Sequence, residues 1–301
     1  KYFPLPYLLG QTGFRAMLAA SCVACATRLR ITAAGGVRLH VRAASKFSWS
    51  DMFEKGLEKR KATLGAEYVE KNLAAADDLT RPFQEAMTAW CWGFGWGDAA
   101  IDVKTRSMMN LAMIGALGKM HEWELHCGGA LTNGVSPEQI RAIVHVIGIY
   151  RGVPQAVECF RSARKVLEQA GNLPSARIGE QDLFEAGLAQ RTATLGKEYV
   201  EEQLGAADDF TRPFQEAMTA WGWGFGWGDP VIDVKTRSMM NLAMIGALGK
   251  MHEWEVHCNG AITNGCTPEE IRAAIHVVGI YSGAPQALEC FRVARKVLQA
   301  R

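Results

Sequence analysis

Residues 103–126 read VKTRSMMNLAMIGALGKMHEWELH, and residues 234–257 read VKTRSMMNLAMIGALGKMHEWEVH. The two stretches lie 131 residues apart and differ only where Leu125 is replaced by Val256. Solenoid units repeat roughly every 20 to 50 residues. A period of 131 residues has instead the size of a whole domain. The sequence therefore predicts a tandem duplication of one domain.

The similarity extends to both sides of these segments and defines the expected domain boundaries. We expect repeat one over residues 49–169 and repeat two over residues 181–301, joined by a linker over residues 170–180. The linker contains Gly171 and Pro174, residue types that interrupt helices and mark connections. A chain of 301 residues is long enough for two domains of ordinary size.

Apolar residues recur at helical spacing within each repeat. In repeat one, Ser136, Pro137 and Gln139 have the arrangement of a capping box, which begins a helix. The glycines of residues 93–97 predict a loop after a helix that ends at Trp92. Strand-like alternation of apolar and polar residues is missing, so we predict an all-α fold made of two tandem copies of one helical domain. The helices expected in repeat one cover residues 52–64, 67–76, 80–92, 102–117, 122–132, 137–150 and 153–167.

Composition excludes several classes of function. Basic and acidic residues nearly balance (33 against 31), so nothing indicates a surface for nucleic acid. No apolar run is long enough to cross a bilayer, and we expect no membrane span. The cysteines of the two repeats lie singly, which predicts reduced and mostly buried thiols rather than a disulfide framework. They are Cys91, Cys127, Cys159, Cys258, Cys266 and Cys290.

Residues 1–48 are expected to lie outside the helical fold. Residues 1–16 precede the first methionine and are interpreted as a leader sequence. Residues 17–50 contain five basic residues and no acidic residue, a composition typical of an organellar transit peptide. We predict mitochondrial targeting, with a plastid or cytoplasmic location as the alternatives and a tail without targeting function as the competing interpretation.

One pair of titratable residues recurs in both repeats at helical spacing, Glu122 with His126 and Glu253 with His257. The i,i+4 separation places carboxylate and imidazole on one helix face. A neighbouring carboxylate is expected to raise the pKa of the imidazole and to fix its tautomer, which suits a general acid near neutral pH. Surface ion pairs have the same spacing, so the pattern alone leaves a catalytic and a structural interpretation open.

Two further pairs of residues are candidates for substrate binding. Arg106 and Arg237 stand at the start of an apolar helix, where a guanidinium could bind a substrate carboxylate through two hydrogen bonds. A salt bridge at the helix entry is the structural alternative. The segments around Trp96 and Trp227 are rich in tryptophan and glycine, and could either line a flat organic pocket or pack against the core. The spacing of His, Cys, Asp and Glu predicts no metal site.

Five motifs follow one another in repeat one and return in the same order in repeat two. They are Asp-Asp-Leu-Thr-Arg-Pro-Phe-Gln (77–84), the Trp-Gly segment (90–97), Thr-Arg-Ser (105–107), Glu-x3-His-x5-Thr-Asn-Gly (122–134) and Ile-Tyr-x-Gly-x-Pro (149–154). As an ordered set they resemble the carboxymuconolactone decarboxylase family, which belongs to the alkylhydroperoxidase D-like superfamily. The resemblance covers each repeat almost end to end and is closest to the 4-carboxymuconolactone decarboxylases.

The resemblance implies an oligomeric, all-helical enzyme that removes CO2 without a cofactor from a small carboxylated lactone such as 4-carboxymuconolactone. If the ancestral domain pairs two-fold, the tandem chain supplies that dimer, and three chains would form a six-domain homo-oligomer. Histidine would protonate the substrate, glutamate would orient the imidazole, arginine would hold a carboxylate and tryptophan would line the pocket. The residues concerned are His126, Glu122, Arg106 and Trp96 in repeat one, and His257, Glu253, Arg237 and Trp227 in repeat two.

Two other functions stay open at this point. One is a non-catalytic structural or accessory subunit of an organellar assembly. The other is an alkylhydroperoxidase-like redox enzyme. The related thiol peroxidases are expected to carry a Cys-x2-Cys motif with a histidine four residues later, but Lys119 and Glu122 stand at those positions before His126. Because attack and resolution of a disulfide require two neighbouring thiols, the sequence disfavours a dithiol peroxidase.

Overall fold

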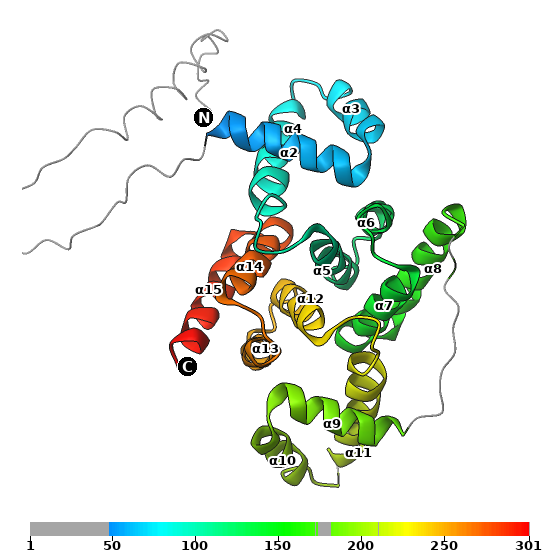
Figure 1. The fold of residues 1–301 in the computed structure, drawn as a ribbon, viewed down its shortest axis with the longest axis vertical. Helices are drawn as coiled ribbons and strands as arrows, with labels where there is room; N and C mark the ends of the chain where they lie inside the picture. Colours follow the sequence, from blue (N-terminus) through cyan, green and yellow to red (C-terminus); the bar gives the residue numbers. More distant parts are fainter. Residues whose placement is uncertain (1–47, 172, 174–181, 210, 301) are drawn as a thin grey trace, which may run out of the picture. The chain divides into compact units, whose positions relative to one another are not determined.

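The described part of the chain is helical throughout, which confirms the predicted all-α fold. The computed structural model describes residues 48–171, 173, 182–209 and 211–300 (Figure 1). Both repeats lie within one compact unit, Phe47–Arg301. The predicted targeting segment, residues 1–48, lies outside the described residues except for Ser48, and mitochondrial targeting stays a prediction.

The two repeats contain the same series of elements. Those of repeat one are α2 (Trp49–Leu64), α3 (Ala66–Ala74), α4 (Arg81–Met87), the π-helix η2 (Thr88–Gly95), α5 (Val103–Ala116), α6 (Met120–Thr132), α7 (Pro137–Arg151) and α8 (Val153–Gln169). Those of repeat two are α9 (Leu183–Leu195), α10 (Lys197–Gly205), α11 (Arg212–Met218), the π-helix η3 (Thr219–Trp227), α12 (Val234–Ala247), α13 (Met251–Thr263), α14 (Pro268–Ser282) and α15 (Ala284–Gln299).

Capping side chains define where the central helices begin. The carboxylates of Asp102 and Asp233 accept hydrogen bonds of 2.9 Å from the backbone N–H three residues later, at the starts of α5 and α12. Ser136 and Gln139 form the predicted capping box of α7. These bonds satisfy backbone donors that a helix leaves unpaired in its first turn.

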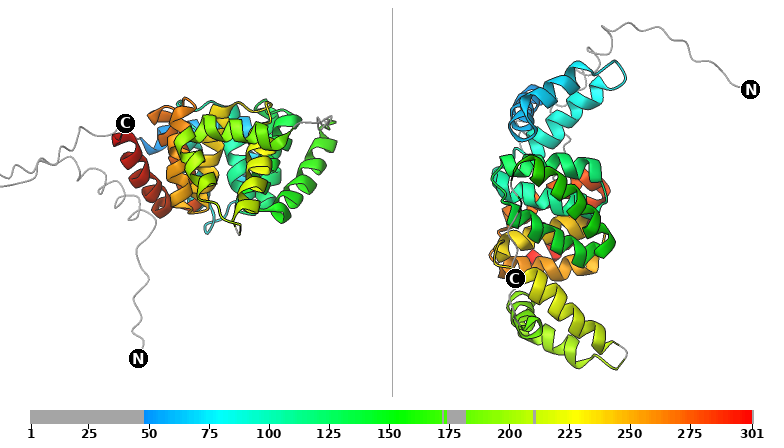
Figure 2. Two further views of the ribbon diagram at one scale, coloured as in Figure 1. Left: turned by 90° about the horizontal axis from the view of Figure 1, so that it is seen from below. Right: turned by 90° about the vertical axis from the view of Figure 1, so that its right-hand side faces the viewer.

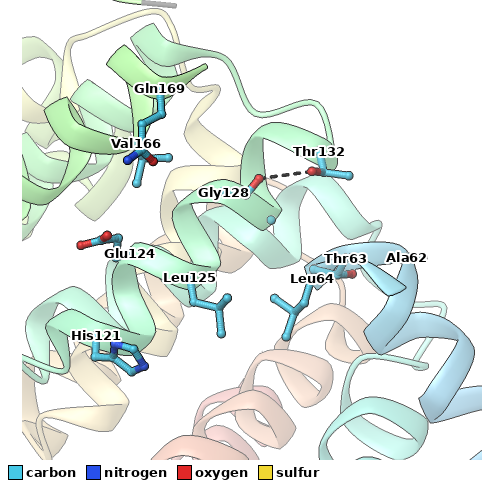
Figure 3. Close-up of a pocket in the computed structure, with 12 residues that line it drawn as sticks. Ala62, Thr63, Leu64, His121, Glu124, Leu125, Gly128, Thr132, Val166 and Gln169 are labelled. Atoms are coloured by element: carbon cyan, nitrogen blue, oxygen red, sulfur yellow. Dashed lines mark hydrogen bonds between the residues drawn. The ribbon is translucent and has the colours of Figure 1, made fainter. Parts of the chain in front are cut away.

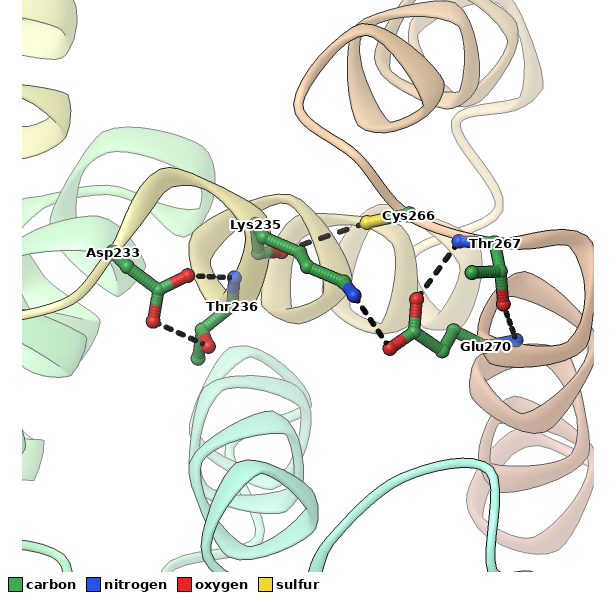
Figure 4. A network of polar contacts seen from close by, with 6 residues as sticks. All are labelled: Asp233, Lys235, Thr236, Cys266, Thr267 and Glu270. Carbon is green, nitrogen blue, oxygen red and sulfur yellow. Dashed lines mark hydrogen bonds and ion pairs between the residues drawn. The ribbon is translucent and has the colours of Figure 1, made fainter.

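In repeat two the starts of α12 and α14 are also joined to each other (Figure 4). Glu270 forms a capping box with Thr267, and its carboxylate also pairs with Lys235 at 2.8 Å. The Cys266 thiol donates a hydrogen bond of 3.6 Å to the carbonyl oxygen of Lys235. Burial raises the pKa of this thiol to about 12, so it stays protonated as a packing group.

The expected glycine-rich loop after Trp92 is wrong, because the chain continues there as the π-helix η2, and as η3 in repeat two. Glycine permits this geometry by allowing two backbones to touch. A Cβ atom at Gly93 would overlap the backbone of Met52 in α2, and one at Gly224 would overlap the backbone of Leu183 in α9. Trp92 and Trp96 of this segment are buried in repeat one, as are Trp223 and Trp227 in repeat two.

Helices α5 and α12 lie side by side at the centre of the molecule (Figure 1). Every residue from Thr105 to Ala116 in α5 is buried, and so is every residue from Thr236 to Gly246 in α12. Apolar side chains of both repeats form one continuous core around this pair. The two copies therefore share a single hydrophobic core.

Each repeat also extends an arm towards its neighbour. Figure 2 shows α2–α4 and α9–α11 on opposite sides of the central helices. The π-helix η2 of repeat one contacts α14 of repeat two, and η3 contacts α7 of repeat one. At these crossings Gly95 faces Ile280 and Gly226 faces Ile149, with no room for a Cβ atom unless the isoleucine moves. Tertiary packing thus brings residues of one repeat next to the π-helix of the other.

Candidate active site

His257 lies in the wall of a cavity between α13, α9, η3 and α7. The cavity has a volume of about 360 Å³, a size suited to a small organic molecule. Aromatic, basic and acidic side chains line it. They include Tyr150, Arg191, Tyr199, Trp223, Trp227, His252, Glu253 and His257. The structure therefore brings the predicted histidine, glutamate and tryptophan of repeat two to one cavity.

Tryptophans in the π-helix or directly after it pack against the imidazoles of His126 and His257. The ring centroid of His257 lies 6.2 Å from Trp223 and 5.9 Å from Trp227, with interplanar angles of 9° and 21°. His126 has the same arrangement, with 6.0 Å to Trp92 and 5.8 Å to Trp96. These rings remove water from the imidazole and leave an apolar surface beside it.

A tyrosine from the opposite repeat completes each group. The hydroxyl of Tyr150, on α7 of repeat one, lies 3.2 Å from Nε2 of His257. The hydroxyl of Tyr281, on α14 of repeat two, lies 3.5 Å from Nε2 of His126. Sequence reasoning missed both tyrosines, although the repeated Ile-Tyr-x-Gly-x-Pro motif contains them.

Two N–H donors hold each phenol oxygen. Trp227 Nε1 donates to Tyr150 over 3.1 Å, and Asn241 Nδ2 donates over 2.9 Å. The corresponding bonds to Tyr281 come from Trp96 over 3.3 Å and from Asn110 over 2.6 Å. We call these two groups the His257 centre and the His126 centre, each consisting of its histidine, the tyrosine of the other repeat, and the tryptophan and asparagine that bind that tyrosine.

The acid–base state of the histidines differs from the expectation. Burial lowers the pKa of His126 and of His257 to about 4, because the apolar surroundings disfavour the imidazolium. The expectation that the neighbouring glutamate raises the histidine pKa is therefore wrong. Both imidazoles are neutral near pH 7.

The two glutamates occupy exposed positions one helical turn before the histidines. Glu253 lines the cavity together with His257, so its carboxylate lies near the opening. Over the described residues, the hydrogen bonds of the structure do not join Glu122 to His126 or Glu253 to His257; each imidazole is hydrogen-bonded to a tyrosine instead.

Arg106 and Arg237 are completely buried. The guanidinium of Arg237 donates to the backbone carbonyls of Gly226, Asp229 and Ile232 over 2.7, 2.7 and 3.2 Å. Arg106 binds the equivalent carbonyls in repeat one. Arg237 is absent from the cavity lining, and desolvation lowers its pKa to about 10. Both arginines clamp the loop that follows the π-helix.

A different arginine faces the cavity. Arg191 on α9 is 3% exposed and lines the cavity with His257. It donates to Thr219 Oγ1 over 3.1 Å and to Gln215 Oε1 over 3.2 Å, while its Nε has no partner. No carboxylate of the described residues forms an ion pair with it. Arg60 has the equivalent position in repeat one and donates to Thr88 over 3.0 Å.

Sequence reasoning missed Arg60 and Arg191. The signal was the stretch Arg-x-Ala-Thr-Leu-Gly, which begins at each of them and is shared by both repeats. A buried guanidinium without an anionic partner is costly unless an anion binds there. Arg191 is therefore a candidate for binding a substrate carboxylate.

Cysteine chemistry is disfavoured by burial. The six described cysteines are free thiols, of which five are buried and Cys91 is half-buried. Burial raises the pKa of Cys127, which follows His126, to about 12 and that of Cys159 to about 11. Because the thiolate is the reactive form, these thiols are unreactive near neutral pH.

A second hollow, of about 440 Å³, is lined by residues of α2, α6 and α8 (Figure 3). His121 and Glu124 line it, and Glu124 pairs with Lys165. His126 is not among its lining residues, so it is separate from the His126 centre. Across the described residues, no three His, Cys, Asp or Glu side chains converge as metal ligands do, and no helix is long and apolar enough to cross a membrane.

Comparison with known proteins finds the same family in both repeats. Residues 81–165 and 212–296 each match the model of the carboxymuconolactone decarboxylase family. The chain is 41% identical over 116 residues to nitrosuccinic acid decarboxylase from Metarhizium robertsii, a match that covers 38% of this chain and 81% of that protein. It is 29% identical over 122 residues to 4-carboxymuconolactone decarboxylase from Acinetobacter baylyi, which covers 40% of this chain and 91% of that protein. Each match has the length of one repeat.

Proposed function

The chain belongs to the carboxymuconolactone decarboxylase family, and on this premise we propose that it is a carboxy-lyase that removes CO2 from a small organic acid. One observation carries the proposal: Arg191 and His257 line the same cavity of about 360 Å³. A guanidinium without a carboxylate partner in the protein can bind a carboxylate of the substrate, and an imidazole can transfer a proton. These are the two tasks that a decarboxylase active site must perform.

The substrate we propose carries two carboxylates and an electron-withdrawing group. The names of the two relatives specify nitrosuccinic acid and 4-carboxymuconolactone. A nitro group or an unsaturated lactone can accept the electron pair that remains when CO2 leaves. A substrate of this class supplies its own electron acceptor, and the proposal therefore includes no cofactor.

We assign roles in the reaction to four of the residues that line the cavity. Arg191 binds the carboxylate that stays on the substrate, and we assign this role to it in place of Arg237. The carboxylate that leaves lies against Trp223 and Trp227, where the apolar surroundings destabilise its localised charge. His257 then delivers a proton to the carbon that has lost CO2. The His126 centre would act in the same way with Arg60.

A neutral histidine delivers this proton from its ring N–H, and a second proton must then reach its other nitrogen. With a pKa of about 4, His257 is uncharged at pH 7 and donates from a ring N–H. Glu253 lies at an exposed position of the same cavity, where it can exchange protons with bulk water. We assign it to proton return, and Glu122 to the same role in repeat one.

The test is release of CO2 by the purified full chain from nitrosuccinic acid and from 4-carboxymuconolactone, the latter followed by ultraviolet absorbance. We expect turnover of at least one acid, and loss of turnover in a chain carrying both His126→Ala and His257→Ala. A matched control is His145→Ala with His276→Ala, which removes one histidine from each repeat that does not line the cavity. The proposal is wrong if the His126/His257 variant retains the rate of this control.

A further inference from the structure

Building on the proposed function, we propose that each reaction centre is shared between the repeats: Tyr150 of repeat one serves His257, and Tyr281 of repeat two serves His126. In each centre the tyrosine is a positioning residue that keeps the imidazole proton on Nδ1. It also supplies its own proton to Nε2 when the Nδ1 proton moves to the substrate.

The direction of the hydrogen bond follows from the partners of Tyr150. The indole N–H of Trp227 and the amide N–H of Asn241 can only donate, and both point at the phenol oxygen. These two bonds use the acceptor capacity of that oxygen. The phenol proton is therefore left for the third neighbour, Nε2 of His257 at 3.2 Å. A nitrogen that accepts a hydrogen bond carries no proton, so Nδ1 must be the protonated nitrogen.

The His126 centre has the same contacts, made with the roles of the repeats exchanged. Trp96 and Asn110 donate to Tyr281, whose hydroxyl lies 3.5 Å from Nε2 of His126. Such agreement between two crossed sets of residues indicates a shared design rather than a chance contact at one interface. It also gives the buried Asn110 and Asn241 a role, as donors that orient the phenols.

The surroundings can stabilise the negative charge that such a proton transfer creates. Burial raises the pKa of Tyr150, so the phenol is protonated in the resting site. The bonds from Trp227 and Asn241 and the positive charge of Arg237 all act in the opposite direction and favour the phenolate. Arg237 thereby supports the reaction without touching the substrate.

Atoms and charges balance in the proposed step. The bond between the substrate carbon and its carboxyl carbon breaks, CO2 leaves, and the electron pair stays on the substrate. The Nδ1 proton of His257 moves to that carbon, and the phenol proton of Tyr150 moves to Nε2. The negative charge ends on the tyrosine oxygen, and one proton from solvent restores the phenol.

Double variants of the full chain test whether the centres are shared. The crossed variants H126A/Y150F and Y281F/H257A damage both centres, whereas the same-centre variants H126A/Y281F and Y150F/H257A damage only one. Each same-centre variant keeps one intact centre, so we expect the rates of the two same-centre variants to add up to the rate of the wild type. This holds whatever share of the wild-type rate each centre contributes. Each crossed variant should fall at least about tenfold below the wild type, since positioned acid–base groups contribute 10² or more to rates. Circular dichroism and melting curves check that all four fold alike.

Crossed variants that remain as active as the better same-centre variant would overturn the proposal. A wild-type chain that releases CO2 from no acid would instead contradict the proposed function. Measurement of the histidine tautomer would still test the proposed hydrogen bond from tyrosine to histidine in that case, because the measurement requires no turnover.

The tautomer is measured by ¹⁵N NMR of histidine-labelled chain. His257→Asn and His126→Asn assign the two signals. We expect a proton on Nδ1 of His257 in the wild type and a mixed or Nε2-protonated ring in Tyr150→Phe, with His126 unchanged. Tyr281→Phe is the matched control and should change only His126. A proton on Nε2 in the wild type, as would follow if Asn241 presented its oxygen to Tyr150, would refute the assigned direction.

Discussion

Replacing Arg191 by methionine tests the assignment of carboxylate binding. The side chain is 3% exposed and donates to Thr219 and Gln215, with its Nε unpartnered. A charged hydrogen bond contributes about 1.5 to 3 kcal/mol, so one or two bonds to a substrate carboxylate amount to about 3 kcal/mol. This corresponds to a loss of about 100-fold in kcat/KM. The loss should fall mainly on KM, because the remaining carboxylate is bound equally in the ground state and the transition state.

The measurement requires a chain in which a single centre works. Arg191→Met is therefore made together with His126→Ala, and kcat/KM is compared with that of His126→Ala alone. Arg191→Lys keeps the charge but not the planar guanidinium, and should lose less than the methionine variant. Stability should change by no more than about 2 kcal/mol, because the variant removes a desolvated cation but leaves the oxygens of Thr219 and Gln215 without a donor. A folded Arg191→Met chain with kcat/KM within threefold of its parent would refute the assignment.

Three further outcomes follow from the structure. The free energy of unfolding should fall as pH decreases from about 6.5 to 4, by about 1 kcal/mol per pH unit for each buried histidine, because these histidines take up protons in the unfolded state but stay neutral in the folded state. Urea titrations at several pH values measure this for the wild type and for a variant with both His126→Asn and His257→Asn, and an equal dependence of unfolding free energy on pH in the two proteins would contradict it. Arg237→Met should destabilise the fold by about 3 kcal/mol or more, since three backbone carbonyls lose their donor; an unchanged melting temperature would show that this clamp is dispensable. Gly224→Ala should destabilise the fold by about 1 to 3 kcal/mol and by more than Gly226→Ala, because a Cβ at residue 224 meets the backbone of Leu183 whereas a Cβ at residue 226 meets the movable end of the Ile149 side chain. Thermal melts that rank the two variants in the reverse order would contradict the close contact between η3 and α9.

Much of the fold could be predicted from the chain because its signals are local or repeated. The period of 131 residues identified the duplication without reference to any contact. Asp102 and Ser136 marked helix starts because a capping side chain bonds to backbone only two or three residues away. The π-helices could not be predicted in the same way. Gly93 and Gly224 must be glycine because a helix distant in sequence, α2 or α9, contacts their backbone. From the local sequence alone, such glycines predict a loop.

In the candidate site too, residues in repeated motifs could be predicted from the sequence, whereas contacts between distant residues could not. The sequence by itself predicted the family correctly, and it proposed His126 and His257 with Trp96 and Trp227 as site residues, because these belong to motifs that recur in both repeats. Only the tertiary structure separated Arg191, which lines the cavity, from Arg237, which binds backbone carbonyls. It also decided the direction of the histidine pKa shift, because burial of the imidazole disfavours its charged form. The contact of Tyr150 with His257 joins residues 107 positions apart in different repeats, and no pattern along the chain records which repeat's tyrosine reaches which histidine. Packing of two copies around one core makes that choice.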